Sequence, residues 1–451
     1  MFQRKIIYEL EKWAADSNRK PLVLRGARQT GKTTVVNQFA KQFDEYVYLN
    51  LELQEDQQAF SNFKNIETLI QAIFFIKDKV FSKEKKTLIF IDEIQEVPEA
   101  LNILRYFYEQ DSGLYVIAAG SLLETLFNQN ISFPVGRVEY LVIRPASFPE
   151  FLDALNENNA IAELNHVPLN DFAYQKLFTL YQTYALIGGM PEIVKQYAEN
   201  KDLVSLQPLY ESLITSYIDD VEKYASNASQ VQILRQSIRA SYIEAGKRIK
   251  FQGFGKSNYG SREMGEALRT LEKALLIYII FPSTDVDLPI MPDMKKSPRL
   301  HVLDTGMMNY FVGIQKEILN TDDLNSIHQG LMIEHLTGQE LLATKFNALS
   351  TLNFWVREKN SSTAEVDYIY QYENKLIPIE VKSGATGKLK SLHVFMDMAS
   401  HNMAVRIYAG KLEISKIKTS ASKEYFLLNL PHFLISQIDK YLEWFEDEIK
   451  I

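Results

Sequence analysis

The sequence predicts an α/β protein of about three domains, in which a parallel sheet covered by helices comes first. Three observations support this. The chain has 451 residues, of which 46% are hydrophobic, so it can bury several cores. Residues 1–150 alternate short apolar runs with helical patterns, which is typical of strands joined by crossover helices. A glycine-containing turn links the first apolar run to the first helix of this pattern.

The five strands expected in residues 1–150 are short and mostly apolar, as buried parallel strands are. They cover residues 22–25, 46–51, 87–92, 114–119 and 138–143. The carboxyl ends of parallel strands meet at one edge of the sheet, so polar residues that follow them are expected to gather there.

Residues 26–33 read Gly-Ala-Arg-Gln-Thr-Gly-Lys-Thr, the pattern of a phosphate-binding P-loop between a strand and a helix. Glycines let successive backbone N–H groups point at a polyphosphate, and the helix adds the positive end of its dipole. Lys32 is expected to reach the β- and γ-phosphates, and Thr33 to ligate Mg²⁺. The residues predicted to bind the nucleotide, ATP, are Gly26, Ala27, Arg28, Gln29, Thr30, Gly31, Lys32, Thr33 and Thr34.

Two acids, Asp92 and Glu93, end the apolar strand at residues 87–92 and therefore emerge at the edge where the P-loop lies. Asp92 is expected to hold Mg²⁺. Glu93 is expected to orient and deprotonate the water that attacks the γ-phosphate. A water-activating acid predicts hydrolysis of ATP, because a phosphotransferase with another acceptor has no use for it.

Two further side chains near this edge each have two interpretations. Ser121 follows the fourth strand, so it is either a sensor that binds the attacking water or γ-phosphate, or the N-cap of a helix at residues 122–127. Arg137 precedes the fifth strand on a glycine turn. It either neutralises transition-state charge, in cis or from a neighbouring subunit, or forms a structural ion pair.

The middle of the chain divides into two predicted segments. Residues 151–228 are rich in helical patterns and are expected to form a lid on the first domain. Residues 229–315 combine helices with an apolar hairpin, which predicts a winged-helix-like domain with a recognition helix at 261–274. Basic residues of this region would suit phosphate contacts with DNA. They are Lys247, Arg248, Lys250, Lys256, Lys295, Lys296 and Arg299.

Residues 316–451 form the last predicted domain, and a hairpin there places Asp367, Glu380 and Lys382 on one side. Glu334, on a preceding helix, is expected at the same site. Two carboxylates that hold Mg²⁺ or Mn²⁺ against a phosphodiester, with a lysine near the attacking water, form a hydrolytic site. An acid on a helix, an Asp on a strand and Glu-x-Lys on the next resembles the restriction-endonuclease-like fold, which implies Glu334, Asp367 and Glu380 as metal ligands.

The whole set of motifs resembles bacterial and archaeal AAA-type ATPases that carry an uncharacterised C-terminal domain. The resemblance rests on the P-loop, the strand ending in Asp92 and Glu93, the Ala-Gly-Ser turn, and residues 135–151. It continues through Gly-Gly-Met-Pro at 188–191 and Leu-Asp-Thr-Gly at 303–306 to the nuclease-like segment.

Composition narrows the functional classes. The chain contains no cysteine, so disulfides, zinc thiolate sites and cysteine nucleophiles are excluded. Its net charge of -8 argues against a uniformly basic nucleic-acid coat. The sequence predicts a cytoplasmic ATPase without a membrane segment, acting through a nuclease-like domain that binds or cleaves nucleic acid. The alternative is an ATP-dependent switch whose nuclease-like domain is a non-catalytic scaffold for a protein partner or a second copy.

Overall fold

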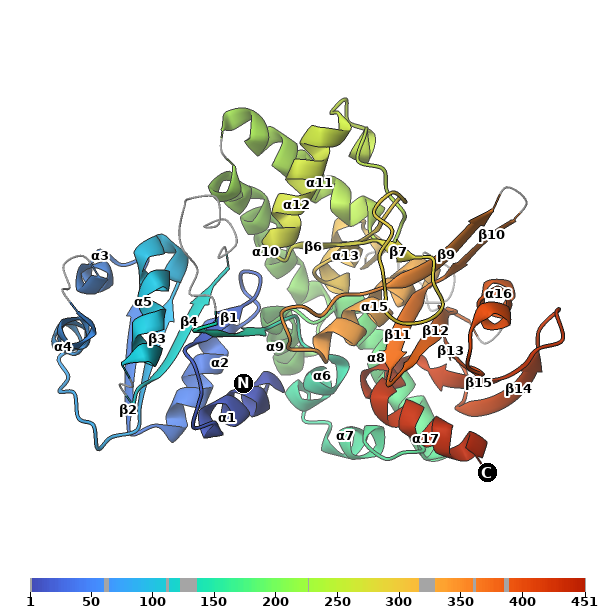
Figure 1. The fold of residues 1–451 in the computed structure, drawn as a ribbon, viewed down its shortest axis with the longest axis horizontal. Helices are drawn as coiled ribbons and strands as arrows, with labels where there is room; N and C mark the ends of the chain where they lie inside the picture. Colours follow the sequence, from blue (N-terminus) through green and yellow to red (C-terminus); the bar gives the residue numbers. More distant parts are fainter. Residues whose placement is uncertain are drawn as a thin grey trace.

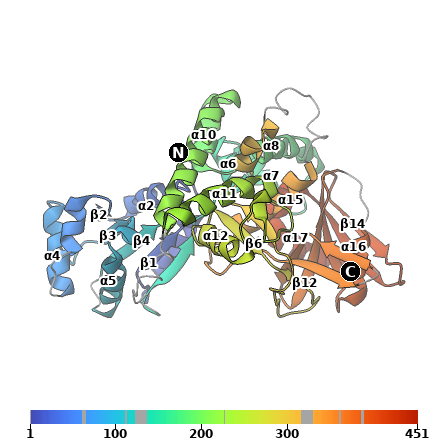
Figure 2. The same cartoon turned by 90° about the horizontal axis from the view of Figure 1, so that it is seen from above.

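The structure is a computed structural model that describes residues 2–60, 65–110, 113–121, 136–225, 227–315, 329–359, 362–384 and 389–450. Two perpendicular views show the N-terminal sheet at one end, the C-terminal sheet at the other, and helices between them (Figures 1 and 2). Among the helices of these described ranges, none combines the length and apolar character that crossing a membrane requires.

The N-terminal sheet has five strands, all parallel, in the order β2-β3-β4-β1-β5. This confirms the predicted parallel core. The strands are β1 (Leu22–Arg25), β2 (Glu45–Asn50), β3 (Thr87–Asp92), β4 (Tyr115–Gly120) and β5 (Glu139–Val142). The helices are α1 (Ile6–Ala15), α2 (Lys32–Phe39), α3 (Gln54–Gln57), α4 (Ile66–Ile76) and α5 (Pro98–Glu109).

Helices cover both faces of this sheet, which is why its central strands are apolar except at their ends. All six residues of β3 are buried, and alternate side chains point to opposite faces. Leu88 and Phe90 pack with α1 and α2, whereas Ile89 and Ile91 pack with α4 and α5. The arrangement brings the carboxyl ends of β1, β3 and β4 to one edge.

The middle of the chain is mainly helical. Its helices are α6 (Phe148–Ala154), α7 (Asn158–Leu164), α8 (Tyr174–Ile187), α9 (Pro191–Asn200), α10 (Gln207–Asp220), α11 (Ala228–Glu244), α12 (Ser261–Lys273) and α13 (Thr305–Phe311). β6 (Ile277–Ile280) and β8 (Arg299–Val302) form an antiparallel pair after α12, which packs on α11. α12 covers residues 261–273 of the segment predicted as a recognition helix, whose role stays a prediction.

The C-terminal region contains a mixed five-stranded sheet in the order β11-β12-β13-β15-β14. A second, three-stranded sheet has the order β10-β9-β7. The elements are β7 (Pro282–Ser283), α15 (Gln329–Ala343), β9 (Phe354–Lys359), β10 (Ser362–Val366), β11 (Tyr368–Tyr372), β12 (Lys375–Val381), α16 (Lys390–Met398), β13 (Met403–Tyr408), β14 (Glu413–Lys418), β15 (Glu424–Pro431) and α17 (Ile438–Lys450).

One buried apolar cluster joins the helical middle of the chain to the C-terminal sheet. It includes Tyr184 of α8, Leu234 of α11, Leu268 of α12 and Val405 of β13. The three segments predicted as separate domains after residue 150 therefore share one core. We call residues 148–450, which contain these segments, the C-terminal body. The N-terminal sheet packs against its own two clusters.

Two buried carboxylates tie distant parts of the C-terminal body together. Asp304 accepts hydrogen bonds from the backbone N–H groups of Gly189 (2.6 Å) and Met307 (3.0 Å). Glu340 of α15 accepts from Phe148 N (3.0 Å) at the start of α6 and from the hydroxyl of Tyr184 (2.5 Å). Only glycine fits at position 189, because a Cβ there would lie 2.2 Å from the carbonyl oxygen of Ala146. The Gly-Gly motif at 188–189 and the Asp-Thr-Gly motif at 304–306 are thus in contact. We call these two motifs, together with the contacts of Glu340, the joint.

Glu340 should make stability depend on pH. Burial raises the pKa of its carboxyl to about 7 from an ordinary 4.5. Between these values the folded chain binds the proton more tightly than the unfolded chain, so the free energy of unfolding falls as pH rises. Glu340→Gln mimics the neutral form. The variant should be about as stable as wild type at pH 4, and as much as ~3 kcal/mol more stable than wild type at pH 8.

Urea unfolding of both chains at the two pH values measures this difference. Glu340→Gln keeps the side-chain oxygen that accepts from Phe148 and Tyr184, so loss of these bonds should not obscure the result. A stability difference that is the same at both pH values would contradict the assignment.

Candidate functional site

The glycine-containing loop lies between β1 and α2, as the sequence predicts. Gly31 has a φ of 94° and precedes the first residue of α2, Lys32. Lys32 Nζ donates to the carbonyl oxygens of Gly26 (2.9 Å) and Ala27 (3.1 Å), so the ammonium lies against the loop. A Cβ on Gly26 would lie 2.7 Å from the carbonyl oxygen of Ile143, so only glycine fits there.

The predicted Mg²⁺ ligands lie side by side next to this loop. The Thr33 hydroxyl donates to Asp92 Oδ2 at 2.6 Å. Burial raises the pKa of Asp92 and lowers that of Lys32, whereas Glu93 and Asp92 oppose the change at Lys32. A hydroxyl and a carboxylate oxygen are the hard ligands that Mg²⁺ prefers, so the pair fits that ion.

Glu93 has a left-handed backbone conformation, with a φ of 50°. Its carboxylate accepts a hydrogen bond from the side-chain amide of Gln95 at 2.6 Å. It lines a cleft of about 520 Å³ together with Lys32 and Thr33. The lysine, the hydroxyl and the candidate base therefore face one cavity.

The far wall of this cleft comes from a part of the chain that the loop motif does not predict. Pro191, Glu192 and Lys195 of α9 line it, opposite the loop residues. The Gly-Gly-Met-Pro sequence before α9 was the only signal, and it indicates a turn, not a ligand site. The C-terminal body thus contributes to the cleft. The lining also includes Phe2, Arg28, Gln29, Gly31 and Thr34.

The structure places the two ambiguous side chains differently. Gly120 pairs with Arg25, so Ser121 follows β4 at the level of the loop. The helix predicted at residues 122–127 lies outside the described residues. Arg137 precedes β5, about six residues or ~20 Å along the strand direction from the loop. It pairs with Glu109 at 3.0 Å. This placement argues against the predicted role of Arg137 in cis.

The four residues predicted to form a hydrolytic site do gather at the C-terminal sheet. Asp367 lies between β10 and β11 and accepts from Val381 N at 2.8 Å. The Lys382 ammonium donates to Glu380 at 2.5 Å. Burial raises the pKa of Glu334 to about 8, against the effect of Arg299, and that of Glu380 to about 7. We call Glu334, Glu365, Asp367, Glu380 and Lys382 the acidic cluster.

Arg299 of β8 occupies the centre of the acidic cluster and was not predicted there. Its side chain is 3% exposed. Its guanidinium pairs with Glu334 and Glu365, lies 3.9 Å from Asp367, and donates to the carbonyl oxygen of Asp367 at 2.9 Å. Within the described ranges, no three His, Asp or Glu residues are arranged to hold a metal ion. The predicted second Mg²⁺ or Mn²⁺ would have to compete with Arg299 for Glu334 and Asp367.

Other basic residues predicted to contact DNA are also paired within the chain. Arg248 and Lys296 each approach Glu358 of β9 at 2.6 Å, and Arg248 lies 3.6 Å from Glu365. With Arg299, three of the seven predicted phosphate contacts instead hold the winged-helix-like segment to strands β9 and β10. The sequence did not indicate these partners, which lie more than 60 residues away.

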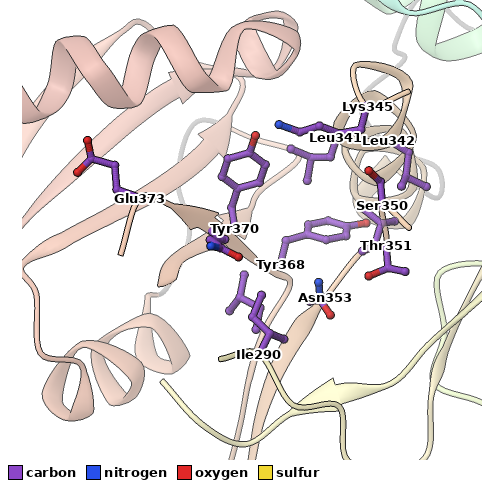
Figure 3. Close-up of a pocket in the computed structure, with 13 residues that line it drawn as sticks. Ile290, Leu341, Leu342, Lys345, Ser350, Thr351, Asn353, Tyr368, Tyr370 and Glu373 are labelled. Atoms are coloured by element: carbon purple, nitrogen blue, oxygen red, sulfur yellow. The ribbon is translucent and has the colours of Figure 1, made fainter. Parts of the chain in front are cut away.

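A separate cavity of about 430 Å³ lies beside the end of α15 and the edge strand β11 (Figure 3). Lys345 Nζ lies 5.1 Å from the ring centre of Tyr370, and both side chains bind Asp439. Glu334, Asp367, Glu380 and Lys382 do not line this cavity. The acidic cluster and the cavity are therefore distinct features of the C-terminal body.

Removing Arg299 should leave buried carboxylates without a cation. Arg299→Met is expected to lower the free energy of unfolding by about 3–5 kcal/mol, as removal of one partner of a buried ion pair does. Above pH 8, where Glu334 is ionised, adding Glu334→Gln should recover part of the loss, because it removes one of the unpaired charges. Urea unfolding of the single and double variants measures both effects. A double variant less stable than Arg299→Met would contradict a compensating role for Arg299.

Family comparisons divide the chain into three matched regions. Residues 18–152 match an AAA domain. Residues 178–318 match a Domain of unknown function (DUF8612), and residues 329–426 match a Domain of unknown function (DUF4143). No curated protein matches the chain.

Solved structures similar to the chain have low sequence identity. The Walker-type ATPase PABY2304 of Pyrococcus abyssi is 14% identical, with a TM-score of 0.44, covering 69% of this chain and 96% of that one. The Aeropyrum pernix ORC1 protein in complex with DNA is 12% identical, with a TM-score of 0.30 and coverages of 70% and 92%. AMPPCP-bound DnaA from Aquifex aeolicus is 12% identical, with a TM-score of 0.28 and coverages of 60% and 88%. The loop geometry and the family match agree that residues 18–152 form a domain similar to AAA domains, with a P-loop between β1 and α2.

Proposed function

We propose that the chain binds ATP with Mg²⁺ in the cleft beside the loop and hydrolyses it. The observation that carries this proposal is the 2.6 Å contact of Asp92 with Thr33, which lines the cleft together with Lys32 and Glu93. A cation at the β- and γ-phosphates, two hard oxygen ligands and a candidate base are the parts that phosphoryl transfer to water needs.

Each residue has a separate role in this proposal. Thr33 and Asp92 would hold Mg²⁺, which supplies charge neutralisation on the phosphate oxygens. Lys32 would leave the loop carbonyls and bind the phosphates. Glu93, positioned by Gln95, would orient the water and accept its proton. Ser121 would bind the water or γ-phosphate from the end of β4.

Arg137 would neutralise transition-state charge only from a neighbouring subunit, since it lies far from the loop of its own chain. This form of the proposal requires an oligomer in which the start of β5 faces the cleft of the next copy. Hydrolysis per subunit would then rise with protein concentration, and Arg137→Ala would abolish that rise.

We further propose that hydrolysis moves the C-terminal body relative to the N-terminal sheet. The cleft lies between them, with α9 as its far wall. The shared apolar core supports movement of α6–α10 and the C-terminal sheet as one unit. Domain closure around nucleotides is a common way to couple hydrolysis to a distant surface.

Two functions are candidates for the C-terminal body. The order α15, β9–β12, α16, β13 and the set Glu334, Asp367, Glu380 and Lys382 support a restriction-endonuclease-like domain that binds or cleaves nucleic acid. The alternative is a non-catalytic scaffold for a protein partner. The buried Arg299 favours the scaffold, because it takes the carboxylates that cleavage would require.

Substitutions in the loop and at the base should separate binding from hydrolysis. Lys32→Ala should abolish ATP binding, whereas Glu93→Gln should bind ATP and lower kcat by about 100-fold or more. Equilibrium binding of a fluorescent ATP analogue and phosphate release measure the two steps. Lys41→Ala and Glu96→Gln, exposed residues of the same domain, are the matched controls. Wild-type turnover in Lys32→Ala would refute the proposed site.

The scaffold assignment predicts that the chain does not cut nucleic acid. Linear, supercoiled and single-stranded DNA should remain intact with ATP and Mg²⁺ or Mn²⁺, as judged on gels. Asp367→Ala/Lys382→Ala is the test variant, and Asp293→Ala/Lys295→Ala makes the same change of charge outside the cluster. Cleavage by wild type and by the second variant, but not the first, would establish the nuclease instead.

A further inference from the structure

Arg28 connects the nucleotide loop directly to the C-terminal body. Its guanidinium contacts the carboxylate of Asp220, the last residue of α10, at 2.5 Å. The hydroxyl of Tyr217, one turn earlier on α10, donates to the carbonyl oxygen of Arg28 at 2.5 Å. Both the side chain and the backbone of this loop residue are therefore held by α10.

The same guanidinium also lines the cleft proposed to bind ATP. Arg28 lies there with Lys32, Thr33 and Glu93, and its side chain is 35% exposed. Asp220 is more buried, at 14% exposed. The arginine thus lies between a carboxylate on the C-terminal body and the space that phosphates would fill.

We propose that Arg28 exchanges its partner when ATP binds, leaving Asp220 for the nucleotide phosphates and so releasing the end of α10. This inference rests on the proposed ATP site. A triphosphate carries several negative charges against one on Asp220, and a guanidinium binds phosphate oxygens in a two-pronged geometry. Arg28 would report phosphate occupancy from within the loop.

Asp220 is not left without a cation by this exchange. Lys223 Nζ lies 3.9 Å from its second oxygen, Oδ1. This alternative partner lowers the cost of losing Arg28, because the carboxylate keeps a nearby positive charge. The two arrangements can therefore be close in free energy, as a nucleotide-controlled switch requires.

Movement at the end of α10 would spread through the C-terminal body. Tyr217 is buried in the shared core together with Tyr210 of the same helix. Tyr210 donates to the carbonyl oxygen of Ile187, next to the Gly188–Gly189 joint that Asp304 holds, and stacks on Tyr310 of α13. A shift of α10 would reach this joint through two fixed contacts.

The change of partner by Arg28 can be tested by amide hydrogen–deuterium exchange and mass spectrometry. Residues 207–225 are measured with and without ATP. Every chain should carry Glu93→Gln, so that ATP is not consumed. The inference predicts faster exchange at the end of α10 when ATP is present. Adding Arg28→Gln should weaken ATP binding by roughly 10-fold or more. With saturating ATP, the change in α10 should be absent from this variant.

Asp220→Asn provides the complementary test, because it removes the shorter ion pair of Arg28 and leaves only the 3.9 Å approach of Glu52. ATP binding should tighten by roughly 2- to 5-fold, the effect of losing one partly exposed ion pair. Exchange in α10 without ATP should already resemble the ATP-bound parent. Asp219→Asn, which alters an exposed acid one residue earlier, should affect neither quantity.

The outcomes distinguish this inference from the proposed function. Three outcomes would each overturn the change of partner by Arg28 alone. They are ATP binding that leaves hydrogen exchange in α10 unchanged, an ATP-induced change that persists in Arg28→Gln, and unaltered ATP affinity in Asp220→Asn. A parent chain that does not bind ATP would overturn the proposed site together with it.

Discussion

The structure depends on the joint formed by two buried carboxylates, Asp304 and Glu340. Each accepts hydrogen bonds from backbone groups far away in the sequence, at Gly189 and Phe148. A buried carboxylate costs free energy unless its oxygens are bonded, so these acids strongly favour the one arrangement that satisfies them. They hold the starts of α6 and α9 to α15 and α13, and a single apolar core surrounds them.

This joint changes the expected relation between the parts of the chain. The lid was expected as a domain of its own, but α6–α10 belong to the C-terminal body and bring it to the nucleotide cleft. The acidic cluster has a similar effect on the winged-helix-like segment, because Arg299 of that segment is bound by Glu334 and Glu365. Residues expected to act on nucleic acid also connect segments of the same chain.

Local sequence was sufficient for the N-terminal site, and insufficient for these connections. The strand at 22–25, the Thr33–Asp92 pair and the position of Glu93 follow from periodicity and from the common edge of parallel strands. Alternation in a hairpin likewise placed Glu380 and Lys382 together. Arg299, Glu340 and Asp220 acquire their roles from partners 35 to 192 residues away, for which one sequence contains no periodic signal.

The distance between the N-terminal sheet and the C-terminal body is the most direct test of this account. The chain has no cysteine, so spin labels can be attached at Lys41→Cys and Lys418→Cys in a Glu93→Gln background. Pulsed electron–electron double resonance should show that ATP changes this distance. The distance between control labels at Glu199→Cys and Lys418→Cys, both in the C-terminal body, should remain unchanged. An unchanged first distance despite bound ATP, or a change in the control pair, would contradict movement of the body as one unit.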